Sequence, residues 1–470
     1  MAAPSRAALS LVCLFILILG VRLIPAGPIT EPDSDTYSEL GQNLVKHHCF
    51  GWIDEKTGVC TPIWGTQPPG YPALLGAARA LGSGSLYPVI LIQTVIFAIA
   101  AIYALWAAYA WHKSLPALLI SGAILALSPA TIAWPRWVMT ETLAAASVLW
   151  VFAEVFRSLA LRRLRILQLS LALATATLLR WDQVWLLVPA AACAIHMEDR
   201  NPLNVCRPIA ILGFSSGLVI LFMVLRAATV GLPLLPTVDE DLTQGAKEFW
   251  RVAAKNQSFE RSFMWPIEDK KYAGMASKFD YSSLAPGFDT ADLHTVINKI
   301  STLPPDSALP EKLDAELADL ARNPSSEGWS RFHLLAYRVM AIWTQWDNFY
   351  ESGWKTSPDT TGAEYLVRPY RIPLLIFAAS LLLVSRGERL FILGGLVSYV
   401  ALRTCFFAFI GLLETRFLVP MLPSMELVLI TAAVLTTLRV WTPAGESEFT
   451  FTSSANQAEQ EARLNRAPIN

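Results

Sequence analysis

Residues 87–110 read YPVILIQTVIFAIAAIYALWAAYA, a run without a single charged side chain. A helix needs roughly 20 such residues to cross the hydrocarbon core of a bilayer. Similar apolar runs recur along the chain, with polar segments between them, at about residues 8–26, 87–110, 115–133, 141–160, 166–179, 183–196, 208–228, 369–384, 389–410 and 417–438. Because lipid cannot solvate free backbone groups or ions, this pattern predicts an all-α polytopic membrane protein of about ten spans.

The composition agrees with this class of protein. Hydrophobic residues make up 54% of the 470 residues and charged residues only 16%, against about 25% charged residues in soluble domains. The net charge of −1 provides no basic field, so no nucleic acid partner is expected. Arg6 precedes the first run and no small-x-small cleavage site follows Ala26, so we expect a retained first span rather than a removed signal peptide.

Positive charges in short loops predict the orientation. With a cytoplasmic N-terminus, clusters such as Arg162-Arg163-Leu164-Arg165 fall on the cytoplasmic side, as the positive-inside rule requires. The chain then divides into an N-terminal transmembrane module (1–228) with a first outer loop (28–86), a large outer segment (229–367), C-terminal spans (368–440) and a polar cytoplasmic tail (441–470). We therefore expect a protein of the cell (inner) membrane with both termini cytoplasmic and a disordered tail.

Two cysteines share the first outer loop. Cys49 and Cys60 lie in a compartment that is oxidising on this topology, so we expect them to form a disulfide.

Two acids follow the first span. Asp33 and Asp35 precede residues 37–44, which read as a short amphipathic helix on the membrane surface. A carboxylate near low dielectric has a raised pKa unless it is paired, which suits a proton acceptor. The alternative is a helix cap with solvated charge.

A second set of charged residues lies at the outer edges of the spans. Glu141 begins a span, where burying an acid costs free energy, so it is a candidate functional residue. The alternative is that it complements the helix dipole and pairs with Arg136. Four arginines lie at the outer edges of the spans: Arg136, Arg180, Arg403 and Arg416. A guanidinium can bind a phosphate there through a bidentate fork. The alternative is that the side chain extends to ordinary lipid. Arg180 lies beside Asp182, and Arg416 beside Glu414.

The sequence contains no metal-binding spacing of histidines or cysteines. A divalent metal ion held by Asp33, Asp35 or Glu141 is left open, and no other cofactor is expected.

The order of these features resembles the GT-C superfamily of polyprenyl-phosphate-sugar-dependent glycosyltransferases, and within it the protein O-mannosyltransferases and lipid A aminoarabinose transferases. The matching landmarks are Asp33 four residues before Tyr37, Gln67-Pro68-Pro69-Gly70-Tyr71-Pro72, Glu141 after a tight outer turn, Leu179-Arg180, and Glu414-Thr415-Arg416-Phe417. The resemblance covers residues 8–225 well, continues weakly through the last spans and does not extend to the large outer segment. Relatives often carry Asp-Glu where this chain has Asp33-Ser34-Asp35, so either acid is a candidate base, with the spacing favouring Asp33.

The resemblance implies transfer of a sugar from a polyprenyl-phosphate donor to an acceptor hydroxyl of a glycan, lipid or protein, with inversion, on the extracytoplasmic face. It implies Asp33 or Asp35 as the base, the arginines at the donor phosphate, and Tyr37, Tyr71 and Glu414 as positioning residues. Glu141 would be a further catalytic acid that orients the acceptor, holds Arg136 or helps to bind a metal. Two other functions remain open, a transporter or flippase of lipid-linked sugars and a polymerase or ligase that uses polyprenyl-diphosphate glycans. Arg368 and Arg371, which flank the large segment, would suit the latter.

Overall fold

The computed structural model consists almost entirely of helices. It describes residues 5–23, 27–30, 32–54, 56–63, 68–82, 84–128, 134–197, 202–232, 243–324, 329–344, 361–411 and 415–441. Within these ranges the only paired strands form one short hairpin. The predicted cytoplasmic tail and Glu414 lie outside the described residues.

Five described helices are long and apolar enough to cross a membrane. They are α1 (Arg6–Leu23), α4 (Tyr87–His112), α6 (Glu141–Leu161), α9 (Pro202–Thr229, with the candidate span from Pro208) and α18 (Glu388–Ile410). Four further predicted runs form shorter apolar helices: α5 (Leu115–Leu127), α7 (Ile166–Leu179), residues Tyr370–Val384 of α17 (Thr361–Val384) and residues Leu422–Leu438 of α19 (Leu422–Trp441). The membrane-protein class is supported. Among the described residues five helices, not ten, are long and apolar enough to cross a membrane, and the described apolar stretches of the other four runs are shorter.

The sixth predicted run is divided. A 3₁₀ segment, η2 (Trp181–Leu186), follows α7, and only the 11 residues of α8 (Leu187–Met197) continue as an α-helix. The break occurs at Arg180, whose extended backbone (φ −154°, ψ 129°) ends α7. As a result, the residues around Arg180 leave the apolar helix and can take part in a polar site.

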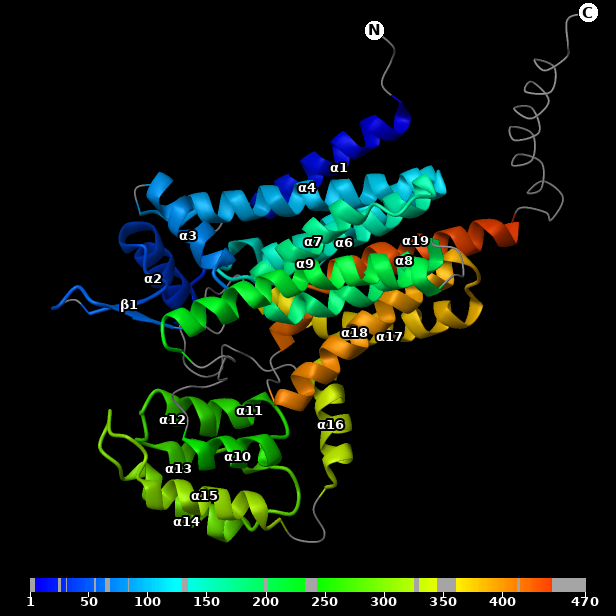
Figure 1. Cartoon of the computed structure of the whole chain (residues 1–470). Coiled ribbons are helices and arrows are strands. Elements are labelled where there is room, and N and C mark those ends of the chain that lie inside the picture. The colour runs from blue at the N-terminus through cyan, green and yellow to red at the C-terminus, as the bar shows by residue number, and fades with distance from the viewer. Residues whose placement is uncertain are drawn as a thin grey trace, which may run out of the picture.

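The apolar helices pack side by side around α6 (Figure 1). Side chains of α6 are buried along most of its length because α4, α7, α8 and α19 surround it. Figure 1 also shows that α1 begins and α19 ends at the same end of this bundle. The opposite end carries α2 (Pro32–His47), α3 (Gly70–Leu81) and the strand hairpin, and we call it the working end.

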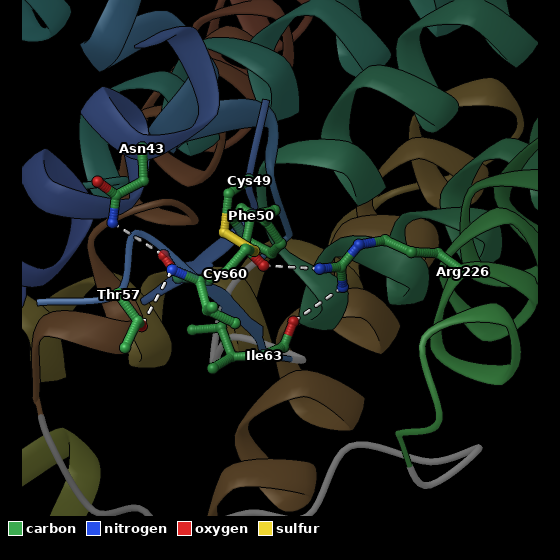
Figure 2. The surroundings of a disulfide bond; sticks show 9 residues. Asn43, Cys49, Phe50, Thr57, Cys60, Ile63 and Arg226 are labelled. Atoms are coloured by element: carbon green, nitrogen blue, oxygen red, sulfur yellow. Dashed lines mark hydrogen bonds between the residues drawn. A yellow bond between two sulfur atoms is a disulfide. The ribbon is translucent and has the colours of Figure 1, made fainter. Parts of the chain in front are cut away.

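The segment between α1 and α4 is tied to the working end. Strands β1 (Gly51–Ile53) and β2 (Cys60–Pro62) pair antiparallel, and a disulfide joins Cys49 to Cys60 as predicted, with 6.0 Å between the Cα atoms. Arg226 of α9 donates hydrogen bonds to the carbonyl oxygens of Phe50 (2.6 Å) and Ile63 (2.8 Å) on either side of the hairpin (Figure 2). The hairpin is therefore fixed to a candidate membrane helix.

Helix α2 begins earlier than the predicted helix over residues 37–44, so Asp33 and Asp35 lie in its first turn rather than before it. It packs closely on α3 where two glycines meet. A Cβ on Gly41 would lie 2.4 Å from the Pro72 carbonyl oxygen, and one on Gly76 only 2.2 Å from the Gly41 carbonyl oxygen. Glycine at both positions permits this distance between the helix backbones.

The predicted large outer segment contains a helical domain with its own hydrophobic core. Its main helices are α10 (Gln244–Ala253), α14 (Thr290–Ser301) and α15 (Glu311–Arg322). Buried aromatic residues such as Phe249, Trp250 and Phe263 form a core that is separate from that of the bundle. The domain lies beyond the working end, next to α16 (Arg331–Thr344) (Figure 1).

Candidate functional site

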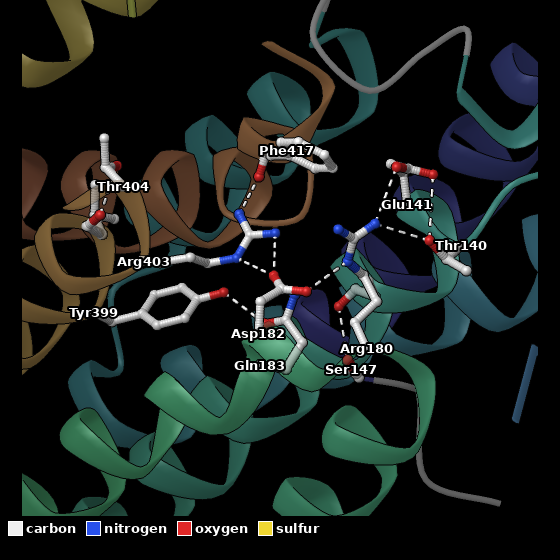
Figure 3. Close-up of polar contacts among 12 residues, drawn as sticks. Thr140, Glu141, Ser147, Arg180, Asp182, Gln183, Tyr399, Arg403, Thr404 and Phe417 are labelled. Carbon is white, nitrogen blue, oxygen red and sulfur yellow. Dashed lines mark hydrogen bonds and ion pairs between the residues drawn. The ribbon is translucent and has the colours of Figure 1, made fainter. Parts of the chain in front are cut away.

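A buried ion-pair network lies at the working end, where α6, η2 and α18 meet. It contains two acids, Glu141 and Asp182, and two arginines, Arg180 and Arg403. Glu141 is the first residue of α6, Arg180 and Asp182 flank the break after α7, and Arg403 lies two turns before the end of α18. The three segments that contribute these residues are far apart in the sequence (Figure 3).

Asp182 bridges the two arginines. Its Oδ1 accepts a hydrogen bond from Nε of Arg180 (2.9 Å), and its Oδ2 accepts from Nε of Arg403 (2.5 Å). Arg180 also donates through Nη1 to Oγ1 of Thr140 (2.9 Å) and to Oε1 of Glu141 (3.1 Å). Arg403 donates through Nη1 to the Phe417 carbonyl oxygen in the segment before α19.

The charges in this network balance while the side chains are excluded from solvent. Relative exposure is 2% for Arg180, 0% for Arg403, 1% for Glu141 and 6% for Asp182. An isolated buried ion costs several kcal/mol, so each of these charges depends on its partners. The aromatic ring of Phe417 lies 5.4 Å from the Arg180 guanidinium and covers the network on one side.

The segment between α1 and α4, predicted to be the first outer loop, meets the start of α6 through backbone and aromatic contacts. Ile29 pairs with the turn before α6: its N–H donates to the Arg136 carbonyl (2.9 Å) and its carbonyl accepts from Val138 (3.0 Å). Gln93 of α4 donates to the Trp137 carbonyl (2.8 Å), and its amide oxygen is 3.5 Å from the hydroxyl of Tyr71. Together these contacts hold the loop across the start of α6.

Tyr37 and Tyr71 form the surface that links α2 and α3 to the ion pairs. Their rings meet edge to face at a centroid distance of 5.5 Å, and both side chains are buried. The two rings pack in one hydrophobic cluster with Val138 and Leu143, which lie on either side of Glu141 in the sequence, and with Leu179, the neighbour of Arg180. The structure therefore brings Tyr37, Tyr71, Glu141 and Arg180 together.

The remaining predicted site residues are placed as follows. Asp33 is half-buried and Asp35 is exposed, both in the first turn of α2. Arg416 belongs to η6 (Thr415–Leu418), and only its backbone is described. The alternative in which Glu141 pairs with Arg136 is not what the structure shows, because Glu141 pairs with Arg180 once α7 packs beside α6. Arg136 is half-buried, and its Nε has no hydrogen-bond partner within the described chain.

A second polar cluster, which we did not predict from the sequence, lies inside the bundle. Glu426 of α19 is fully buried and accepts hydrogen bonds from Ser128 after α5 and from Tyr370 of α17 (2.9 Å). Arg22 of α1 donates to the carbonyls of Leu125 (2.9 Å) and Ala126 (3.1 Å). Glu426 is the single acid in the run 417–438, and that position alone marks it as a candidate.

Among the described residues no group of three or more His, Cys, Asp or Glu side chains is arranged to hold a metal ion. No family model matches the chain, and no curated protein sequence matches it.

Proposed function

We propose that the chain is a membrane glycosyltransferase that moves a sugar from a polyprenyl-phosphate donor to an acceptor hydroxyl at the working end, on the extracytoplasmic side. One observation carries the proposal. Five parts of the chain, namely α2, α3, the start of α6 with the turn before it, the break after α7 and the end of α18, bring acids, arginines and tyrosines together at one end of an apolar bundle. A donor whose tail lies in the bilayer would present its phosphate at this level.

The proposed chemistry requires one base and one cation. As the acceptor oxygen bonds to the anomeric carbon, the bond from that carbon to the phosphate oxygen breaks, and the hydroxyl proton passes to a carboxylate. Asp33 suits the base because it is half-buried near Tyr37, whereas Asp35 is exposed. Attack opposite the leaving phosphate gives inversion.

The ion pairs favour Arg136 as the first contact of the donor phosphate. Arg180 and Arg403 already share Asp182 and Glu141, so a phosphate would have to compete with buried carboxylates for them. Arg136 has no ion pair with a described carboxylate. We assign Arg136 to donor binding and the Arg180–Asp182–Arg403 group to positioning, with Arg416 as an additional donor contact.

The test is transfer by the purified full-length chain in nanodiscs. Sugars linked to polyprenyl phosphate and to polyprenyl diphosphate are supplied separately, with a panel of glycan, lipid and peptide acceptors and with or without Mg²⁺. The proposal expects release of polyprenyl phosphate from the first donor and loss of at least a hundredfold in rate for Asp33→Asn. Glu39→Gln, which changes an exposed acid on the same helix, is the matched control.

Other outcomes identify the other functions. Turnover of the diphosphate donor alone would indicate a polymerase or ligase. Movement of a labelled lipid-linked sugar across the membrane without transfer would indicate a transporter. Loss of activity in Asp35→Asn with normal activity in Asp33→Asn would move the base to Asp35.

A further inference from the structure

A large cavity lies away from the ion-pair network, between the helical domain, α16 and the last turn of α18. Its volume is about 980 Å³. The walls are mostly apolar and aromatic. Trp250 comes from α10, Trp329 from the segment before α16, Phe332 from the start of α16, and Phe409 from α18. Phe332 and Phe409 are 74% and 75% exposed. Because α18 is a candidate membrane span, the cavity reaches the level at which a membrane helix ends.

The charged residues around this cavity are predominantly positive. Four arginines and one glutamate line it. The glutamate, Glu248, is paired with Arg322 (3.3 Å), and Arg338 donates to three backbone carbonyls. Arg251 and Arg331 are exposed and make no ion pair with any carboxylate in the described ranges. Two cations are thus available at the edge of an apolar cavity.

A buried donor in the same wall is also unused. The Trp250 side chain is 1% exposed, and its Nε1–H has no acceptor among the residues that the structure describes. Buried N–H groups are rarely left without a partner, and a bound molecule with an oxygen acceptor is one way in which such a group is satisfied. An apolar wall, two available guanidinium groups and a buried N–H donor together fit a molecule with an aliphatic part and an anionic, oxygen-rich head.

We infer that this cavity binds a single lipid with a phosphate-bearing head group, its head at Arg251 and Arg331 and the first part of its tail against Phe332 and Phe409. The inference is independent of the proposed transferase activity, because the cavity shares no residue with the ion-pair network. Its test contains no sugar donor.

The experiment is native mass spectrometry of the full-length chain released from detergent. Dioleoyl phosphatidic acid, dioleoyl phosphatidylcholine and sodium phosphate are titrated separately. We expect one phosphatidic acid to be retained per chain, little phosphatidylcholine, and no displacement by millimolar phosphate. The double variant R251Q/R331Q should bind phosphatidic acid about tenfold more weakly, equivalent to ~1.4 kcal/mol.

Two further variants keep the test decisive. Arg386→Gln removes an exposed arginine at the other end of the bundle and should leave the affinity unchanged. Phe332→Ala removes an exposed ring from the cavity wall and should weaken binding severalfold even if the double variant folds poorly. Equal retention of phosphatidylcholine, full displacement by free phosphate, or normal affinity in both cavity variants would overturn the inference.

Discussion

Asp182 and Arg403 are 221 residues apart in the sequence, yet Oδ2 of the acid lies 2.5 Å from Nε of the arginine in the buried interior of the working end. The pair links the break after α7 to α18, and Asp182 extends it through Arg180 to Glu141 at the start of α6. Two carboxylates and two arginines therefore link the break after α7 to both α18 and α6.

Replacing Asp182 by Asn should destabilise the protein strongly. The change leaves Arg180 and Arg403 with one fewer negative charge in a buried site, and breaking a buried pair typically costs roughly 3–5 kcal/mol. Thermal unfolding in detergent would show a lowered midpoint. Asp269→Asn is the control, because its pair with Lys271 is exposed and should contribute about 0–1 kcal/mol. Equal midpoints for the two variants would show that the network carries little stability.

The contact between α2 and α3 gives a second prediction. Gly76→Ala would place a Cβ 2.2 Å from the Gly41 carbonyl oxygen, so the helices must separate, at a cost of about 1–3 kcal/mol. Under the proposed function, transfer should fall as well, because α2 carries Asp33. Gly394→Ala is the matched control: this helical glycine has no atom within 4 Å of an added Cβ, so the change should be neutral or slightly stabilising. A normal unfolding midpoint in Gly76→Ala would contradict the close packing.

The sequence predicted associations between residues that lie close together in the chain. It did not predict the ion pairs between distant segments of the working end. Arg180 and Asp182 are nearly adjacent, and Cys49 and Cys60 share one loop, so local reasoning was sufficient to associate each pair. The alternative pairing of Glu141 with Arg136 rests on the same closeness in sequence, but helix packing places Arg180 beside Glu141 instead.

Features that depend on packing between distant segments were not predictable from patterns of one sequence. The Gly41–Gly76 contact and the Asp182–Arg403 pair each require knowledge of which helices are neighbours. The arrangement of the helical domain likewise depends on a core of aromatic residues that follow no simple repeat in the sequence.

The disulfide should protect the hairpin from proteolysis. Cys49 and Cys60 close a loop with a sequence separation of 11, and closing a loop of this size stabilises the folded state by roughly 2–3 kcal/mol in the chain-entropy model. Lys56 is exposed within that loop. Trypsin should therefore cut after Lys56 faster in Cys60→Ser than in the unmodified chain, as mapped by mass spectrometry. Cys206→Ser, which changes an exposed free cysteine, should leave the rate unchanged; a similar rate in all three proteins would mean that the strands alone hold the loop.

Arg338 connects the helical domain to the bundle through hydrogen bonds. Its guanidinium donates to the carbonyls of Ala254 (2.8 Å) and Arg251 (2.9 Å) at the end of α10, and to that of Ala408 (3.2 Å) in α18. Arg338→Met keeps the apolar stem but leaves these carbonyls without their donor, and an unsatisfied buried acceptor costs about 1–3 kcal/mol. Because the lost bonds all cross between α16 and its neighbours, local opening should exceed global destabilisation. Hydrogen–deuterium exchange should rise at the end of α10 and in α16 and stay unchanged in α6, whereas Lys312→Met, an exposed change in α15, should alter neither. Uniformly faster exchange across α6 would instead mean that the domain and the bundle unfold as one unit.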